Sequence, residues 1–188
     1  LHVATNAGKW SDESLHRIDA HLSSLGSTEV QLDWNDIEME DLNHFTDAGS
    51  NVFLKRFVET VLPYVKTPTL YIVTDSTIDH NNYSGEGKFH NRASSHITTL
   101  FRAHGIRACV DAISGSGFVA RAHVHEHFRP RLIAHLANVT SPTTILFMGG
   151  WNDITSNHSV ARILNAISSC VSVVTYGLKF RAAAPVTF

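Results

Sequence analysis

Short β-rich runs alternate with helical patterns along most of this 188-residue chain. Five runs are rich in β-branched and apolar residues: Glu29–Trp34, Thr69–Thr74, Ile106–Asp111, Thr143–Met148 and Val171–Tyr176. Several are almost continuously apolar, which is typical of strands covered by helices on both faces. The alternation of strand and helix therefore predicts an α/β fold, a three-layer α/β/α sandwich around an open, mostly parallel sheet.

Helical patterns fill the segments between these runs, and capping or breaking residues mark their ends. The expected helices cover Ser11–Leu25, 50–62, Asn91–His104, Phe118–Ala137 and Asn157–Ser169. Gly26, Pro63 and Gly105 directly follow the first three. The sequence has no internal repeat or long linker, and its length suits one hydrophobic core. We expect a single domain over residues 1–188.

Composition excludes several classes of protein. The 15 Lys and Arg against 17 Asp and Glu give a formal net charge of −2, so the basic surface of a dedicated nucleic-acid binder is missing. No apolar run reaches the roughly 18 residues of a membrane span. The two cysteines, Cys109 and Cys170, are too few for the disulfide framework of a small secreted protein. We expect neither a nucleic-acid partner nor a membrane span.

The cellular compartment and the oligomeric state stay open. Three Asn-x-Ser/Thr sequons, beginning at Asn82, Asn138 and Asn157, lean toward the secretory pathway. The chain begins at Leu1 rather than Met, so we expect that an upstream segment has been removed.

Thirteen histidines raise the question of a metal site or a pH sensor. The densest cluster is 123–127, in which His123 and His127 would share one helical face as zinc-binding pairs do. The cluster lacks a His-Glu-x-x-His pattern, and Arg121, Arg129 and Arg131 would oppose a bound cation. A solvated helix face is the preferred interpretation, and we expect no metal.

Ligands of open parallel sheets bind beyond the carboxyl ends of the strands. Ser76 follows the second run directly, in a position suited to a nucleophile. Gly115 and Gly117 follow the third run and permit a tight turn that directs backbone N–H groups toward the strand ends. After the fourth run, Asn152 can direct its amide N–H into the cleft, and Asp153 can fix the loop by local hydrogen bonds.

Asp41 and His44 follow the first run. Their spacing can place the carboxylate on the imidazole Nδ1 and leave Nε2 to take a proton from a hydroxyl. Taken alone, three of the four turns are more typical of capping or turn residues, and for the Asn152 turn an Asx-turn with helix capping has equal weight. Their occurrence together favours a catalytic site. Flavin or nucleotide binding is an alternative, although residues 74–78 are too few for a phosphate cradle.

The four turns together resemble the motifs of the SGNH, or GDSL, hydrolases, which cleave esters and related acyl groups. Thr74-Asp75-Ser76 resembles the GDS block, Ile113-Ser114-Gly115 the glycine block, Gly150-Trp151-Asn152-Asp153 the GxND block, and Asp41-Leu42-Asn43-His44 the DxxH block. The resemblance implies the family's five-stranded, flavodoxin-like sheet. Thr74 departs from the pattern, because the family usually has Gly there.

The order of the motifs also departs from the family, because Asp41 and His44 precede Ser76. This order implies a circular permutation in which residues 1–62 correspond to the family's C-terminal part and 69–188 to its N-terminal part.

The cut is expected between the Val171–Tyr176 run and the Ser11–Leu25 helix. Both termini, Leu1 and Phe188, are then expected close together at the active-site end of the sheet. Excision from a precursor of tandem copies is one route to such a chain.

The resemblance implies a serine hydrolase with a catalytic triad of Ser76, His44 and Asp41. It also implies an oxyanion hole formed by Ser76, Gly115 and Asn152. Short-chain acyl or acetyl esters of small molecules, glycans or lipids are the expected substrates, and no cofactor is required. The alternative is a non-catalytic glycan- or lipid-binding descendant of the same fold, which the departure from the GDS block favours.

Overall fold

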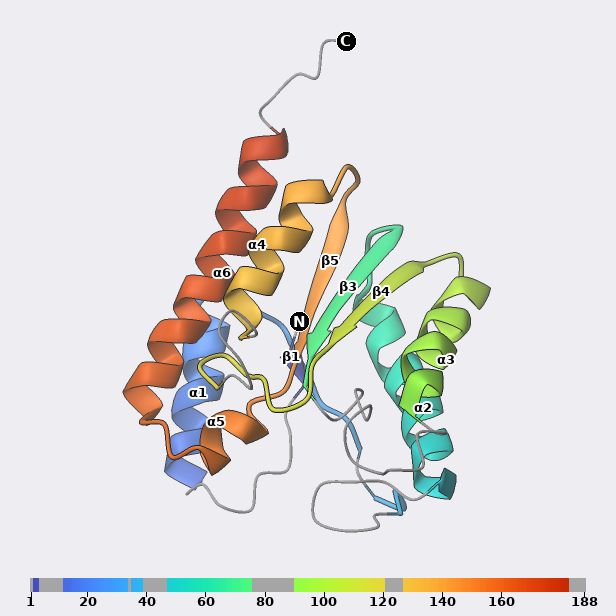
Figure 1. Cartoon of the computed structure of the whole chain (residues 1–188), viewed down its shortest axis with the longest axis horizontal. Coiled ribbons are helices and arrows are strands. Elements are labelled where there is room, and N and C mark those ends of the chain that lie inside the picture. Colours follow the sequence, from blue (N-terminus) through green and yellow to red (C-terminus); the bar gives the residue numbers. More distant parts are fainter. Residues whose placement is uncertain are drawn as a thin grey trace.

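The computed structural model describes residues 2–3, 12–33, 35–38, 47–75, 90–120 and 127–182. Its strands form a parallel sheet in the order β2-β1-β5-β3-β4 (Figure 1). The strands are β1 (His2–Val3), β2 (Glu29–Val30), β3 (Thr69–Thr74), β4 (Arg107–Ala112) and β5 (Thr143–Met148). The prediction of an α/β fold with a mostly parallel, open sheet is confirmed.

β3 lies at the centre of the three long strands, because it pairs with β4 on one side and β5 on the other. Thr74, the last residue of β3, lies opposite Ala112 of β4 and Met148 of β5. The carboxyl ends of the three strands are therefore level. Every residue of β3 is buried, as its nearly continuous apolar sequence predicts.

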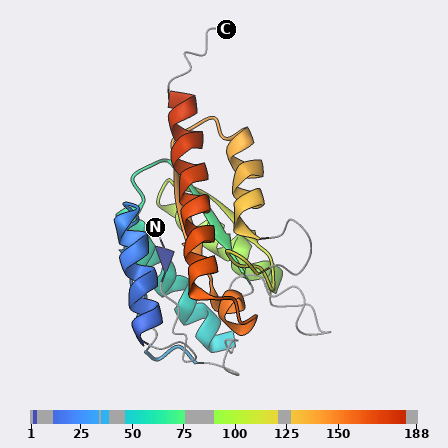
Figure 2. The same cartoon turned by 90° about the vertical axis from the view of Figure 1, so that its left-hand side faces the viewer.

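Helices cover both faces of the sheet (Figures 1 and 2). One face carries α1 (Asp12–Ser24), α4 (Phe128–Asn138) and α6 (Val160–Ala182). The other carries α2 (Asp47–Val61) and α3 (His90–Ala103). A short 3₁₀ turn, η1 (Leu62–Tyr64), follows α2, and α5 (Trp151–Thr155) follows β5.

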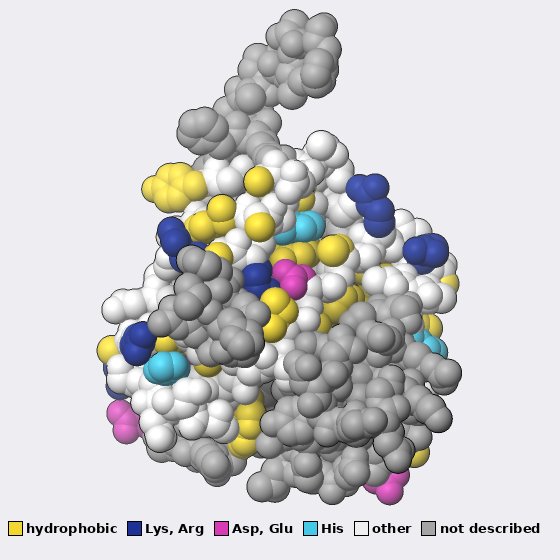
Figure 3. Space-filling model, in the orientation of Figure 1, with side chains coloured by type: hydrophobic (Ala, Val, Ile, Leu, Met, Phe, Trp, Pro, Cys, Tyr) yellow, Lys and Arg dark blue, Asp and Glu magenta, His cyan; other side chains and the backbone are white. Residues whose placement is uncertain are grey.

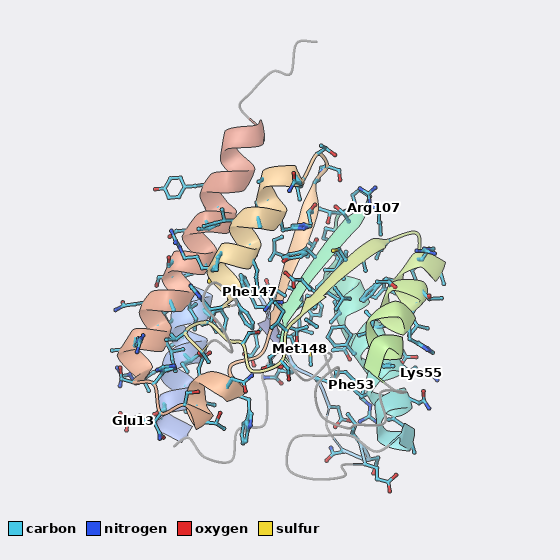
Figure 4. All side chains as sticks on the ribbon, in the orientation of Figure 1. Glu13, Phe53, Lys55, Arg107, Phe147 and Met148 are labelled. Atoms are coloured by element: carbon cyan, nitrogen blue, oxygen red, sulfur yellow. The ribbon has the colours of Figure 1, made fainter. Side chains whose placement is uncertain are left out.

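Two hydrophobic clusters hold these layers together. Side chains of a strand point alternately to its two faces, so successive residues join different clusters. Met148 packs with Phe53 of α2, whereas the preceding residue, Phe147, packs with Phe128 of α4 (Figure 4). The core thus lies on both faces of the sheet and leaves the strand ends for the site.

Several predicted elements are confirmed closely. β3 and β5 have the predicted bounds, and β4 begins and ends one residue later than predicted. α1 ends two residues before Gly26, whose φ of +73° suits glycine. α3 likewise ends shortly before Gly105, and α2 begins at Asp47, three residues earlier than expected.

The predicted strand Val171–Tyr176 is wrong, because these residues belong to α6. Ile163, Ile167 and Cys170 are buried at helical spacing, and the valines that follow continue the same stripe against the cluster of α1 and α4. Packing of this stripe outweighs the β propensity of valine.

The predicted site of the permutation cut, next to a strand at Val171–Tyr176, is therefore wrong as well. α6 ends beside the amino ends of the strands, away from the carboxyl ends where the candidate site lies (Figure 1). Leu1 and Phe188 themselves lie outside the described residues.

Three further predictions need correction. The strand Glu29–Trp34 is reduced to β2, which pairs with the two residues of β1, and Trp34 lies outside the described residues. β1 was not predicted from the sequence. The helix Phe118–Ala137 begins only at Phe128, since 118–120 are held in an irregular turn. The helix expected over Asn157–Ser169 starts at Val160, after Asn157 with a φ of +54°.

Among the described residues, one helix is long and apolar enough to cross a membrane by length and composition alone. It is α6, with a mean hydropathy of 1.3 over Val160–Gly177. In this structure α6 packs against α4 and α1 (Figure 2). Its Cys170 is buried, and burial raises the pKa of the Cys170 thiol to about 12.

Candidate functional site

The candidate site lies where the level carboxyl ends of β3, β4 and β5 open into loops (Figure 1). Two of the predicted site residues, Gly115 and Asn152, are described there. The other three, Asp41, His44 and Ser76, lie outside the described residues. The structure therefore describes the predicted oxyanion side of the site together with Asp75, which directly precedes Ser76.

The residues 113–117 after β4, here called the glycine turn, fold back onto the end of β3. The Ile113 N–H donates to the carbonyl of Thr74 at 3.2 Å, and the Ser116 N–H donates to the carbonyl of Ile113 at 3.2 Å. Gly115 has a φ of +75°, a left-handed conformation that favours glycine. Its own N–H has no hydrogen-bond partner among the described residues.

Two glycines let the chain after β5 pass close to Asp75. Gly149 has a φ of +152°, and a Cβ there would lie 2.8 Å from Cζ of Phe128 and 3.0 Å from Oδ2 of Asp75. Gly150 has a φ of +119° and forms the N-cap of α5. A Cβ at position 149 would therefore clash with Phe128 and Asp75, whereas at position 150 it would meet no atom within 4 Å and only the backbone φ favours glycine.

Asn152 joins the glycine turn to the end of β3. Its Nδ2 donates to the carbonyl of Ser116 at 2.9 Å and approaches Oδ2 of Asp75 at 3.4 Å. The side chain is partly buried, whereas Asp75 is only 1% exposed. The structure thus brings Asn152 and Gly115, predicted from separate strand ends, to one edge of the sheet.

Asp153 organises the segment after the glycine turn. Its carboxylate is fully buried and accepts three backbone N–H groups, from Phe118 at 2.9 Å, Val119 at 2.8 Å and Ala120 at 2.6 Å. The sequence predicted local hydrogen bonds for Asp153, and this is wrong, because its partners lie more than 30 residues away.

Arg131 is the functional residue that sequence reasoning missed. It is 7% exposed, and its guanidinium pairs with Asp111, with 2.8 Å between Nη2 and Oδ1. The same guanidinium donates to the carbonyl of Thr74 at 3.2 Å and to Oγ of Ser116 at 2.9 Å. Tyr71 donates its hydroxyl to the other carboxylate oxygen of Asp111. A buried charge thus touches both β3 and the glycine turn.

The helical spacing in the sequence contained a signal for Arg131. Phe128, Leu132 and Leu136 are buried at i, i+4 and i+8, and Arg131 and His135 lie beside them on the same stripe. A charged residue on the buried stripe of a helix needs a partner, since isolated buried charges are costly.

The hydroxyl of Tyr71 stays protonated at neutral pH. Burial raises the pKa of Tyr71, and the hydrogen bond to Asp111 and the charge of that carboxylate raise it further. Tyr71 therefore acts as a fixed donor that holds the Asp111 carboxylate toward Arg131.

His135 stacks on the ring of Tyr71, with 3.6 Å between ring centroids and 7° between planes. Its Nε2 is buried and has no hydrogen-bond partner among the residues that the structure describes. Burial lowers the pKa of His135, against the opposing effect of the negative charge of Asp111. The imidazole is therefore neutral at pH 7.

A cavity of about 200 Å³ lies at the opposite, amino edge of the same strands, lined in part by Thr69, Arg107 and Thr143. Cys109 and His135 also line it. Burial and then the charge of Asp111 raise the pKa of the Cys109 thiol, which disfavours the thiolate that a nucleophilic cysteine needs. The cavity is separate from the candidate site.

The described residues contain no group of three His, Cys, Asp or Glu side chains that could hold a metal ion. The histidine cluster at 123–127 lies outside the described residues except for His127. On the face shown in Figure 3, apolar side chains gather over α6 and α4, and the acidic and basic side chains near its centre adjoin a histidine.

Chemically, the described edge offers hydrogen-bond donors. The donors described at this edge are the Gly115 N–H and the Asn152 amide. A comparison with models of protein families finds no match for this chain. Searches of curated proteins and of solved structures find no match either.

Proposed function

We propose that this protein is a serine hydrolase that cleaves short-chain carboxylic esters, with Ser76 as nucleophile, His44 as general base and Asp41 as its orienting carboxylate. The observation that carries the proposal is the hydrogen bond from Asn152 to Ser116. It joins the two loops that the sequence predicts to supply the oxyanion hole, directly beside the residue that precedes Ser76.

The strand order supports the proposed permuted SGNH-hydrolase fold. If the chain is read from β3 through β5 and then on to β1 and β2, the observed order β2-β1-β5-β3-β4 becomes 2-1-3-4-5 after renumbering. This is the flavodoxin-like order, in which ligands bind at the carboxyl ends of the strands. In this reading, residues 69–188 supply the family's N-terminal part and 1–62 its C-terminal part, within one domain.

The hydrogen bonds of Asn152 suit an oxyanion donor. The bond to Ser116, at 2.9 Å, fixes the amide plane. The second N–H makes a long hydrogen bond to Asp75, at 3.4 Å, which we expect a substrate oxygen to replace. Gly115 adds a backbone N–H without a partner among the described residues, and we expect the Ser76 N–H to complete the hole.

In the proposed reaction, Oγ of Ser76 attacks the ester carbonyl while His44 takes its proton. Asp41 stabilises the imidazolium, and the three N–H donors hold the negative oxygen of the tetrahedral intermediate. His44 then returns the proton to the leaving alcohol, and an acyl-Ser76 ester remains. Water, activated by His44, hydrolyses this ester and releases the carboxylic acid.

The test is hydrolysis of p-nitrophenyl acetate by the wild type and by Ser76→Ala, with Ser172→Ala on the exposed side of α6 as control. We expect Ser76→Ala to abolish turnover and labelling by a fluorophosphonate probe, while the control keeps both. A pH–rate profile that rises with an apparent pKa near that of histidine, about 6.5, supports His44 as the base. Equal turnover by Ser76→Ala and wild type would show that the nucleophile is wrongly assigned.

Asn152 provides a second test of the same proposal. Asn152→Ala removes one oxyanion donor, and we expect kcat to fall on the order of 100-fold with little change in KM. If the folded wild type shows neither turnover nor labelling, the proposed activity is wrong and the glycan- or lipid-binding alternative is favoured.

A further inference from the structure

We propose that Arg131 is a positioning residue for this reaction, one that holds the nucleophile strand and the glycine turn at a fixed separation. The inference rests on the proposed function, because it concerns how Ser76 and Gly115 are aligned. None of the four sequence motifs includes Arg131, and its guanidinium donates to Asp111, Thr74 and Ser116.

Every nitrogen of the guanidinium is engaged. Nε and Nη2 donate to Oδ1 of Asp111 at 3.1 and 2.8 Å. Nη1 and Nη2 both donate to the carbonyl of Thr74, each at 3.2 Å, and Nη1 also donates to Oγ of Ser116 at 2.9 Å. The planar, forked geometry of arginine allows this whole set, and a lysine ammonium cannot reproduce it.

Two of these acceptors, Thr74 and Ser116, lie on the two segments that the reaction requires to stay aligned. Thr74 ends β3 and stands two residues before Ser76, so fixing its carbonyl fixes the start of the nucleophile turn. Ser116 belongs to the glycine turn and donates its hydroxyl to the carbonyl of Ile113 at 2.7 Å. Arg131 therefore bridges the backbone on both sides of the proposed oxyanion hole.

The surroundings of Arg131 fix its own position. The pair with Asp111 supplies the opposite charge, and the hydroxyl of Tyr71 holds the second oxygen of that carboxylate. The ring of Phe128 lies 5.6 Å from the guanidinium carbon, in the range of a cation–π contact. An apolar residue could fill this position without the cost of burying a charge. We therefore infer that the arginine serves to align Thr74 with the glycine turn.

Loss of this bridge should displace the catalytic groups only slightly, but a small displacement can lower kcat strongly. Arg131→Lys keeps the charge beside Asp111 but loses the simultaneous bonds to Thr74 and Ser116. We expect kcat for p-nitrophenyl acetate to fall roughly 100-fold. We expect KM to stay within about twofold, because the group acts on alignment rather than on ground-state binding. Arg129→Lys, on the exposed side of the same helix, is the matched control.

Titration of active sites with the fluorophosphonate probe separates positioning from loss of folded protein. A residue needed only for folding lowers the fraction of sites that react and leaves turnover per reactive site unchanged. We expect the opposite for Arg131→Lys. Methylguanidinium added to Arg131→Ala is expected to restore part of the turnover, and to leave Arg129→Ala unaffected. Unchanged turnover per titrated site in Arg131→Lys overturns the inference.

Amide hydrogen exchange tests the bridge even if the esterase activity is absent. The Ile113 and Ser116 N–H groups are bonded within the structure that Arg131 holds, so we expect both to exchange faster in Arg131→Lys than in Arg129→Lys. Equal exchange in the two variants overturns the bridging role. A wild type that neither turns over ester nor reacts with the probe, but shows this difference in exchange, contradicts the proposed activity alone.

Discussion

The Asp153 carboxylate accepts the backbone N–H of Ala120 at 2.6 Å, across 33 residues of sequence. Asp153 lies on α5, the short helix after β5, whereas Ala120 lies in the segment after the glycine turn. The same carboxylate accepts the N–H groups of Phe118 and Val119. It thus satisfies three backbone donors that have no partner in a helix or strand. One carboxylate thus sets the conformation of a loop from another part of the sheet edge.

Asp153→Asn should therefore destabilise the protein. The Asn side chain has a single acceptor oxygen, and its amide would face N–H donors instead of accepting from them. We expect the free energy of unfolding to fall by about 2–3 kcal/mol, measured by urea denaturation. Asp33→Asn, at an exposed position, is the control and should change stability by less than about 0.5 kcal/mol. Equal effects at the two positions would contradict the role given to Asp153.

Gly117 and Asp153 should show a strong energetic coupling. A Cβ on Gly117 would lie 2.6 Å from Oδ2 of Asp153, and the hydrogen bonds of that carboxylate prevent it from moving away. We expect Gly117→Ala to lower the free energy of unfolding by about 2 kcal/mol. In an Asp153→Ala background the space is vacant, so the same substitution should cost at least about 1 kcal/mol less. Additive effects in the double variant would exclude this contact as the cause.

The sequence predicted the parts of the fold that local signals determine. β3 could be placed to the residue because six apolar or β-branched residues stand between Pro68 and Asp75, and α1 because Gly26 marks its end. The valines of α6 were misread, since their strand propensity is local and the helical stripe that decides the structure packs on distant elements.

The candidate site was likewise predicted from the sequence only in part. Gly115 and Asn152 could be predicted as neighbours because parallel strands end at one edge of a sheet. The bridge that joins them through Ser116 could not, since it depends on side-chain contacts between segments 36 residues apart. Arg131 was missed for a similar reason, because its four acceptor groups belong to three residues of β3, β4 and the glycine turn.

Thr74 and Thr69, at the two ends of β3, allow a comparison of how an unbonded and a hydrogen-bonded hydroxyl affect the free energy of unfolding. The Oγ1 of Thr74 is buried and has no hydrogen-bond partner within the described part of the chain. The Oγ1 of Thr69 is bonded to the carbonyl of Pro142 and to the hydroxyl of Thr143. We expect Thr74→Val to raise the free energy of unfolding by about 1 kcal/mol, because valine has the same shape and needs no partner.

Thr69→Val should instead lower the free energy of unfolding by about 1 kcal/mol, because it removes a satisfied hydrogen bond. Both variants are measured by urea denaturation under the same conditions. A loss of stability in Thr74→Val comparable to that in Thr69→Val would mean that the Thr74 hydroxyl has a partner in solution.

His135 should make the stability of the protein depend on pH. Its pKa in the folded state lies below the ordinary value of 6.5, chiefly because of burial. Between the folded-state pKa and 6.5, the unfolded chain therefore binds more protons at this position than the folded protein does. The stabilising contribution is fully present above pH 6.5 and is lost as the pH falls through 6.5 toward the lower, folded-state pKa.

His135→Phe removes this titration and keeps a ring to stack on Tyr71. We expect its free energy of unfolding, measured by urea denaturation at several pH values from 7.5 down to 5, to fall less than that of the wild type. His104→Phe, at an exposed position after α3, controls for the loss of a histidine as such and should keep the wild-type slope. The difference in slope isolates His135 from the other histidines, because those contribute equally to both profiles. Parallel profiles for wild type and His135→Phe would show that His135 titrates at the same pH in the folded and unfolded chain.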